Sequence, residues 1–324
     1  MAYPFDGYEV DARMRPLAEA YPFDLDAVLS AVVAVEATIP DDAFTASILG
    51  VERLGNGTVI SASGLVLTIG YLVTEASEVA LTINDGRRVP AHVLGVDSVT
   101  GFGLLQALDP LGVPALAVGT SRGIGAGDPV LLAGAGGRSH AAAGEVLARM
   151  PFAGYWEYLL DEALITQPAH PHWSGAALIG PSGELAGVGS LRLERQTGRG
   201  SAPINMFVPA ELLPPILDDL ASGRAPFPPR PWLGVFAQEN GAHVQVIGIT
   251  PRSPAARAEL RTGDLILELA GVPVHDLADF YGALWAQGPA GTVIPLRLQR
   301  EDDVFEVELR SVDRAALLRK PRFN

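Results

Sequence analysis

Hydrophobic and polar positions alternate over short stretches along most of the chain, and glycine or proline recurs between these stretches. Short segments rich in Val, Leu and Ile, separated by turn residues, predict the β-strands of a barrel or sandwich. The strands predicted before residue 210 are Val32–Ile39, Gly57–Ser61, Leu65–Ile69, Glu78–Ile83, Arg88–Val96, Gly103–Ala107, Pro129–Ala133, Gly144–Arg149, Ala177–Ile179, Leu185–Ser190 and Asn205–Val208. About a dozen strands in this length favour two packed barrels over a single sheet.

Helical periodicity is confined to a few segments. In Glu211–Ala221 the apolar residues fall on one face at helical spacing, and Pro214 and Pro215 would be tolerated in its first turn. Two further helices are predicted at Pro254–Leu260 and Leu277–Gln287. All three lie in the second half of the chain, so the first half is expected to be almost entirely β.

Prolines mark a boundary between two domains. Four of them stand between Pro226 and Pro231, which predicts a stiff, extended spacer. The predicted organisation has five parts: an amino-terminal arm at 1–27, a double β-barrel at 28–221, a linker at 222–231, a second domain at 232–312 and a tail at 313–324.

Composition narrows the classes of partner and chemistry. The chain has 23 basic and 37 acidic residues and a formal charge of −14, which argues against nucleic acid or anionic lipid as a partner. Cysteine is absent, which excludes disulfides, thiolate metal sites and a cysteine nucleophile. No apolar run is long enough to span a bilayer, and the first residues are acidic where an export signal would be basic and apolar. The sequence as written therefore predicts a cytoplasmic protein.

Five motifs follow one another along the chain: Gly55–Thr68, Val89–Leu105, Ala115–Gly134, Pro171–Leu178 and Ile204–Pro209. In this order they resemble the motifs of the HtrA (DegP-like) family of serine proteases. A sixth, Ile249–Ile266, is similar to the family's PDZ signature and is the most specific of the set. The resemblance implies a mainly β fold, a chymotrypsin-like double β-barrel followed by a carboxy-terminal PDZ domain.

The resemblance also places the catalytic residues, and most of them are changed. Tyr71 stands where the family has its general-base histidine, and Gly101 stands where it has the orienting aspartate. Ser174 keeps the nucleophile position, but His172 replaces the glycine whose amide helps to form the oxyanion hole. A phenol that titrates near 10 cannot activate a serine hydroxyl at neutral pH, and glycine has no side chain to orient a base. We therefore expect an inactive protease in which Tyr71 donates a hydrogen bond to Ser174.

A rebuilt active site is the alternative. His170 or His172 would serve as the base, with Asp161 or Glu162 to orient it, giving a weak or unconventional serine endopeptidase that uses Ser174. The same two histidines suggest a metal site, but two imidazoles without a third ligand are more often surface residues. The glycine clusters at 123–127 and 134–137 lack the strand–helix context of phosphate loops. No metal and no cofactor are expected.

The second domain keeps the features of a peptide-binding module. By resemblance, Trp232–Val235 is the carboxylate-binding loop. The backbone amides around Leu233 and Gly234 receive a peptide's terminal carboxylate, and the strand Val235–Phe236 pairs with the peptide. Phe280 and Leu284 would line the pocket for the last side chain of the peptide. The alternative is that this helix face belongs only to the core.

An intact binding module beside an altered catalytic site predicts a scaffolding or regulatory protein. Its expected partners are carboxy-terminal peptides, unfolded proteins or an active homologue, in a setting of protein quality control. The resemblance implies a homotrimer built through the arm, which Tyr3, Phe5, Tyr21 and Phe23 would serve; these rings would otherwise pack on their own barrel. The family is usually extracytoplasmic, whereas no export signal is evident here.

Overall fold

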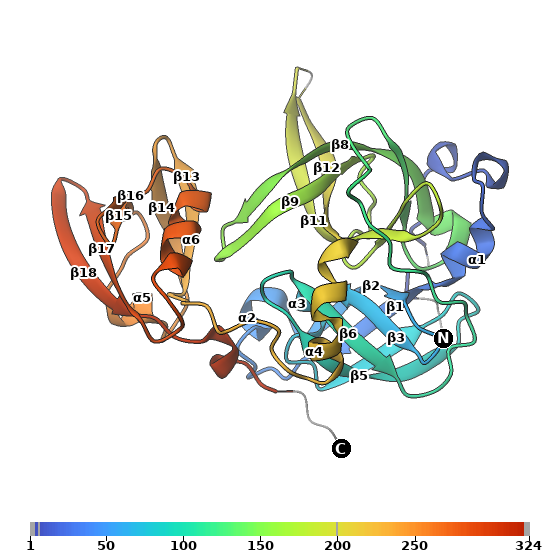
Figure 1. Cartoon of the computed structure of the whole chain (residues 1–324), viewed down its shortest axis with the longest axis horizontal. Helices are drawn as coiled ribbons and strands as arrows, with labels where there is room; N and C mark the ends of the chain where they lie inside the picture. Colours follow the sequence, from blue (N-terminus) through green and yellow to red (C-terminus); the bar gives the residue numbers. More distant parts are fainter. Residues whose placement is uncertain (1–3, 6, 199, 321–324) are drawn as a thin grey trace. The chain divides into compact units, whose positions relative to one another are not determined.

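The structure is a computed structural model, and it describes residues 4, 5, 7–198 and 200–320. The chain divides into two compact units (Figure 1). The first comprises residues 1–150, 162–226 and 319–324, and the second comprises residues 151–161 and 227–318. Within the described part of the chain, no helix is long and apolar enough to cross a membrane.

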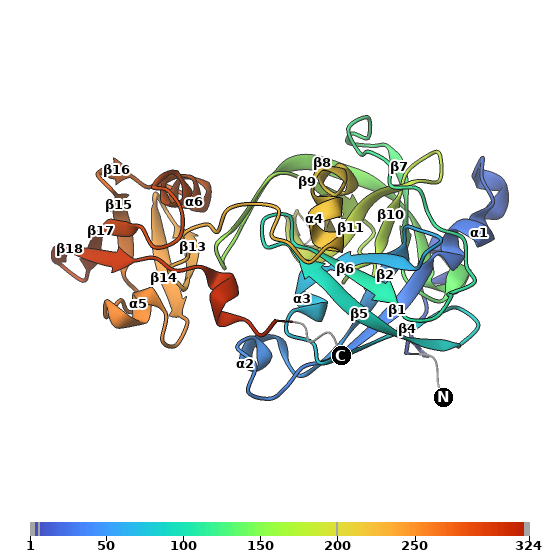
Figure 2. The same ribbon diagram turned by 60° about the horizontal axis from the view of Figure 1, so that its bottom comes forward.

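The first unit begins with a closed six-stranded barrel, whose strand order is β1-β2-β3-β6-β5-β4 (Figure 2). Its strands are β1 (Val32–Thr38), β2 (Glu52–Val59), β3 (Leu65–Ile69), β4 (Glu78–Thr82), β5 (Arg88–Val96) and β6 (Phe102–Ala107). All six strands were predicted, because their apolar residues alternate or run together and fill the barrel interior. For β2 the predicted strand began at Gly57, five residues later than in the structure. Short helices flank the strands: η1 (Ala12–Met14), η2 (Ala18–Ala20), α1 (Leu25–Ser30), α2 (Ala46–Leu49) and α3 (Gly70–Val73).

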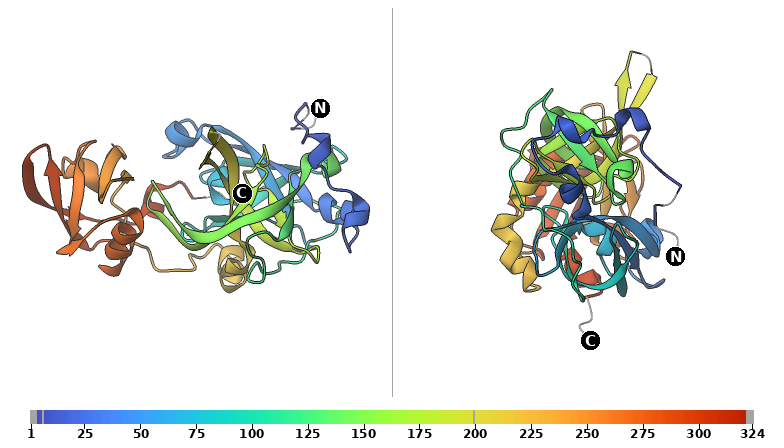
Figure 3. Two further views of the ribbon diagram at one scale, coloured as in Figure 1. Left: turned by 90° about the horizontal axis from the view of Figure 1, so that it is seen from above. Right: turned by 90° about the vertical axis from the view of Figure 1, so that its right-hand side faces the viewer.

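A second closed barrel follows, with the order β10-β11-β12-β9-β8-β7, and Figure 3 shows it from two further sides. It comprises β7 (Pro129–Ala133), β8 (Ala141–Gly154), β9 (Tyr158–Gln167), β10 (Ala177–Ile179), β11 (Leu185–Thr197) and β12 (Gly200–Pro209), with η3 (Gly137–His140) between β7 and β8. Strand β9 was not predicted, since Asp161 and Glu162 interrupt its apolar residues. Both are exposed.

The predicted helix over Glu211–Ala221 is wrong in its extent. The structure has two 3-10 turns, η4 (Ala210–Leu212) and η5 (Pro214–Ile216), and then a single α-helical turn, α4 (Leu217–Ala221). Two consecutive prolines remove two backbone donors, so the segment cannot form one continuous ladder of hydrogen bonds. The apolar face is retained, because Leu213, Ile216 and Leu220 are buried.

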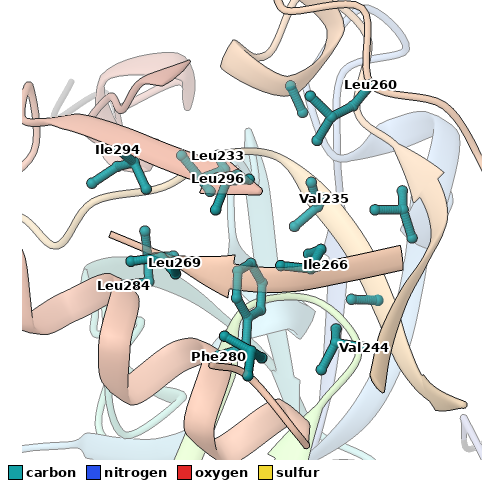
Figure 4. Packing of buried hydrophobic residues seen from close by; sticks show 14 of the residues in the cluster. Leu233, Val235, Val244, Leu260, Ile266, Leu269, Phe280, Leu284, Ile294 and Leu296 are labelled. Carbon is teal, nitrogen blue, oxygen red and sulfur yellow. The ribbon is translucent and has the colours of Figure 1, made fainter. Parts of the chain in front are cut away.

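The second unit contains a sheet of order β13-β14-β15-β17-β18, with β16 paired to β15. The strands are β13 (Val235–Asn240), β14 (His243–Ile249), β15 (Leu265–Leu269), β16 (Val272–Pro273), β17 (Val293–Arg300) and β18 (Asp303–Arg310). The helices are α5 (Pro254–Arg257), α6 (Leu277–Ala286) and η6 (Arg314–Leu317). The side chains of Ser253 and Asp276 cap α5 and α6. Figure 4 shows the core that the sheet and α6 share.

The second unit also includes residues 151–161, the end of the β8–β9 hairpin. Nothing in the sequence pattern indicated that this hairpin would group with residues 227–318. Ala153 and Leu159 pack against the same hydrophobic cluster as Phe280 and Leu284. The predicted fold class is confirmed: two β-barrels precede a smaller β domain with two α-helices.

Candidate functional site

Ser174 and Tyr71 meet between the two barrels. Ser174 lies in the loop before β10, and Tyr71 lies on α3, directly after β3. The Tyr71 hydroxyl donates to Ser174 Oγ at 2.7 Å and lies 2.8 Å from the carbonyl oxygen of Ser190. This confirms the predicted contact. Since the phenol has one proton, it serves one acceptor at a time; when it points to Ser190, the Ser174 hydroxyl donates to the phenol oxygen.

The phenol cannot act as the base that a serine nucleophile needs. Burial raises the pKa of Tyr71 to about 12, against a partial opposing effect of the hydrogen bond to Ser174. Tyr71 therefore stays protonated throughout the neutral range. Within the described residues, no imidazole or carboxylate hydrogen-bonds to Ser174 Oγ.

Gly101, where the family resemblance predicts an orienting aspartate, lies in a backbone turn. Gly101 has φ +84° and donates to the carbonyl of Asp97, and its own carbonyl accepts the Gly70 amide at 2.6 Å. That last bond fixes the start of α3, one residue before Tyr71. The turn is further held by Thr100, whose amide and hydroxyl donate to Asp97. The scaffold of the site persists although Gly101 brings no carboxylate to it.

The backbone amide of His172, two residues before Ser174, is the donor that the family resemblance predicts for the oxyanion hole, and it is not free. The backbone amide of His172 donates to Nδ1 of His170 at 3.1 Å. His170 is fully buried, and its Nε2 lies 2.8 Å from the carbonyl oxygen of His140, to which it donates. Burial lowers the pKa of His170 to about 4, so it is neutral at pH 7. Both of its ring nitrogens are occupied, which leaves neither to serve Ser174 as a base.

The acids considered for a rebuilt site are engaged elsewhere or exposed. Glu162 accepts a hydrogen bond from Arg149 at 2.6 Å, and Asp161 is exposed. Across the described residues, no three His, Cys, Asp or Glu side chains cluster as metal ligands. In the described part of the chain, no base–acid pair is therefore directed at Ser174.

A buried asparagine holds the loop in place. The side-chain amide of Asn56, on β2, donates to the carbonyls of His172 and Ser174, while its oxygen accepts the Ala135 amide at 2.8 Å. Its backbone amide also donates to Ser174 O. Sequence reasoning placed Asn56 within a motif but gave it no role, because these partners lie 79 to 118 residues away.

The amino-terminal arm packs on its own barrel at this site. Phe5 is buried, and its ring centroid lies 4.3 Å from that of His172. Tyr8 approaches the same imidazole edge-on at 4.9 Å, and Tyr21 contacts Phe23. Tyr3 lies outside the described residues. The rings of Phe5 and Tyr8 thus cover the His172 side chain within one chain, and the trimer stays a prediction.

The second candidate site is the loop Trp232–Val235, called here the carboxylate loop. Trp232, Leu233 and Val235 are buried, so the loop presents backbone amides more than side chains. Gly234 has φ +80°, and a Cβ there would lie 2.3 Å from the Cβ of Ser253. Only glycine fits this position without displacing α5, whose first turn Ser253 caps.

The carboxylate loop already binds a carboxylate. Oε1 of Glu157 accepts hydrogen bonds from the amides of Leu233 (3.2 Å), Gly234 (2.7 Å) and Val235 (3.1 Å). Oε2 accepts from Leu233 at 3.1 Å. Burial raises the pKa of Glu157 to about 7, although the three amides act in the opposite direction. Sequence reasoning missed Glu157, since it lies 76 to 78 residues from the three amides that bind it and carries no motif.

The remaining predicted peptide-binding residues lie on β13 and α6. Phe236 follows the carboxylate loop on β13, and its ring lies 6.0 Å from that of Tyr155. Phe280 and Leu284 lie on α6, and both side chains are fully buried in the core of the domain. Their proposed part in a peptide pocket stays a prediction.

Comparisons with known proteins agree with this architecture. The family described as "Trypsin-like peptidase domain" matches residues 55–188, and the family described as "PDZ domain" matches residues 231–310. DegQ of Escherichia coli, a periplasmic pH-dependent serine endoprotease, is 28% identical over 274 residues. That match covers 80% of this chain but only 59% of DegQ.

Another curated relative and a solved structure are also similar to this chain. Serine endoprotease DegS of Salmonella typhimurium is 26% identical over 279 residues, which cover 78% of this chain and 75% of DegS. The solved structure of the HtrA-type protease AlgW with a decapeptide has a TM-score of 0.53 and 22% identity, and the match covers 92% of this chain and 99% of AlgW. By its two domains, their order and these relatives, the chain is an HtrA-like protein with a trypsin-like peptidase domain followed by a PDZ domain.

Proposed function

We propose that this chain is a non-catalytic HtrA-like protein that binds the carboxy termini of peptides or proteins through its PDZ domain. The observation that carries the proposal is the carboxylate loop, in which three consecutive amides converge on one carboxylate oxygen. A peptide's terminal carboxylate presents the same two oxygens to the same donors. The role would be scaffolding or regulation, with client termini or an active homologue as partner.

The altered catalytic site supports the first half of the proposal. Tyr71 fills the space beside Ser174 with a phenol whose pKa is raised to about 12, and the amide of His172 is held by His170. Removal of triad members leaves at most ~10³–10⁴-fold acceleration over water in a serine protease. Here the His172 amide, the oxyanion donor expected to sustain this residual acceleration, is hydrogen-bonded to His170.

The alternative function is a serine endopeptidase that uses Ser174. Two observations favour it: the nucleophile is retained, and relatives such as DegQ and DegS are named endoproteases. It would need a base outside the family's position. The cytoplasmic setting stays a proposal, and DegQ is named periplasmic.

Carboxylate-dependent binding is tested with a glycine substitution in the loop. We expect the protein to bind a subset of an array of synthetic heptapeptides with free carboxy termini, and to lose that binding when the array is amidated. Gly234→Ala should weaken binding at least tenfold, because its Cβ meets Ser253 and displaces the amides.

The matched control is Gly271→Ala in the same domain. Gly271 has φ +79°, nearly the same backbone conformation, but a Cβ there meets no atom within 4 Å. It therefore carries the same conformational cost without touching the loop, and its binding should match that of the unmodified protein. Equal binding to the free and amidated arrays would contradict the proposed function.

A further inference from the structure

The carboxylate loop is occupied by a segment of its own chain. The segment is the hairpin tip, defined here as Gly154–Glu157, which connects β8 to β9. It belongs to the same compact unit as the PDZ domain. The Glu157 carboxylate takes all three amides of the loop, so no outside carboxylate can use them while the tip is bound.

The backbone of the tip also pairs with β13. The Ala237 amide donates to the carbonyl of Tyr155 at 2.9 Å. Tyr155 lies two residues before Glu157, and Ala237 lies two residues after Val235. This is the spacing that antiparallel strand addition requires when the residue bearing the carboxylate faces the loop. The tip thus resembles a bound peptide whose last residue is Glu157.

Side chains of the PDZ domain hold the tip at both ends. The Tyr281 hydroxyl donates to the carbonyl of Gly154 at 2.6 Å and accepts the Glu157 amide at 3.2 Å. Tyr281 lies on α6, the helix that faces β13 across the groove of a PDZ domain. Ala153 and Leu159, on either side of the tip, pack against the hydrophobic cluster that contains Phe280 and Leu284.

The backbone of Glu157 is adapted to this contact. Its φ is +60°, in the left-handed region that glycine and asparagine favour in a tight turn. A glutamate there turns the chain back into β9 while its side chain, and not a chain terminus, enters the loop. The carboxylate contact therefore gives a reason for glutamate at a position where a turn alone would favour glycine.

We propose that the hairpin tip is an internal ligand of the PDZ domain, which an outside carboxy terminus must displace in order to bind. The inference rests on the proposed function, because it assigns a regulation to the same loop. The apparent affinity for a peptide is then the intrinsic affinity multiplied by the fraction of molecules in which the tip is released. A partner can then bind the carboxylate loop only in molecules whose hairpin tip is released from it.

The test compares peptide binding by the whole chain and by its Glu157→Ala variant. The probe is the fluorescein-labelled hexapeptide FAGYWV, which has the sequence of residues 152–156 followed by valine and a free carboxyl terminus. Its tyrosine lies two residues before the terminus, as Tyr155 lies before Glu157, and the amidated peptide is the negative control. We expect Glu157→Ala to lower the dissociation constant, measured by fluorescence anisotropy, at least tenfold.

Glu259→Ala is the matched control for this substitution. Glu259 is an exposed glutamate of the PDZ domain with φ +57°, and its side chain makes no hydrogen bond to the amides of the carboxylate loop. We expect its affinity for the probe to equal that of the unmodified protein. Equal affinities for the unmodified protein and Glu157→Ala would overturn the proposal.

Hydrogen exchange detects the internal contact without any peptide. In the unmodified protein the amides of residues 233–237 should be protected from exchange. Glu157→Ala should lower their protection factors at least tenfold, whereas Glu259→Ala should leave them unchanged. Unchanged protection in Glu157→Ala would overturn the proposal. If protection is lost but neither protein binds the probe or any peptide of the array, the proposed function and the competition both fail, while the tip is still identified as the occupant of the loop.

Discussion

Restoring three family residues together, by Tyr71→His, Gly101→Asp and His172→Gly, is expected to increase the labelling rate of Ser174 by a fluorophosphonate on the order of 10³-fold. Such probes react only with an activated serine hydroxyl. The imidazole supplies the base, the aspartate orients it, and the glycine allows the amide at position 172 to leave the His170 ring. Aspartate tolerates the left-handed backbone at Gly101 better than most residues.

Controls separate the three contributions. Tyr71→His alone should stay unlabelled, because nothing orients the new imidazole and the amide of His172 remains bound to His170 Nδ1. Adding Ser174→Ala to the triple variant should abolish labelling. A triple variant that folds, as judged by circular dichroism, but does not label would mean that the missing groups are not what keeps Ser174 inert.

Docking of the hairpin tip is expected to weaken about 40-fold as the pH rises from 5 to 7. Burial raises the pKa of Glu157 from its ordinary value of 4.5 to about 7 in the docked state. The docked carboxyl thus holds its proton more tightly than the released one, so docking is strongest below pH 4.5. It is lost progressively up to pH 7 and changes little above. A neutral carboxyl can still dock, since Oε1 alone accepts from all three amides.

The groups that face Glu157 do not titrate in this window. The charge of Arg314 acts to lower the pKa of Glu157, and the Tyr281 phenol, whose own pKa is raised by burial, stays neutral. The measurement is hydrogen exchange of residues 233–237 at several pH values, corrected for the intrinsic rate. The non-titrating Glu157→Gln variant should show no such trend. The same loss of protection in Glu157→Gln would refute the assignment to this carboxyl.

Most of the β architecture could be predicted from the sequence, for physical reasons. Leu65–Ile69 and Pro129–Ala133 begin and end as predicted, because short apolar runs between turn residues can form little else. Strand β9 was missed because exposed Asp161 and Glu162 break its apolar pattern. The single helix predicted over Glu211–Ala221 was wrong because Pro214 and Pro215 lack backbone N–H donors and interrupt its hydrogen bonds.

The contacts at the candidate sites could likewise be predicted only in part from the sequence. The contact of Tyr71 with Ser174 could be predicted, because the family resemblance places both residues in one site. The docking of Glu157 could not, since it depends on a long-range approach of two segments and on a φ of +60° that no sequence motif marks. The support that Asn56 and His170 give to the loop was missed for the same reason: both hold it through main-chain groups, which every residue carries.

The central claim is that Ser174 is not an activated nucleophile, and labelling of the purified, unmodified protein by a fluorophosphonate tests it most directly. Intact mass is the readout, and Ser174→Ala is the control. The account predicts no mass increase at neutral pH, because the phenol of Tyr71 has a pKa of about 12 and His170 has no free nitrogen. A mass increase that disappears in Ser174→Ala would contradict it and establish a serine hydrolase with an unrecognised base.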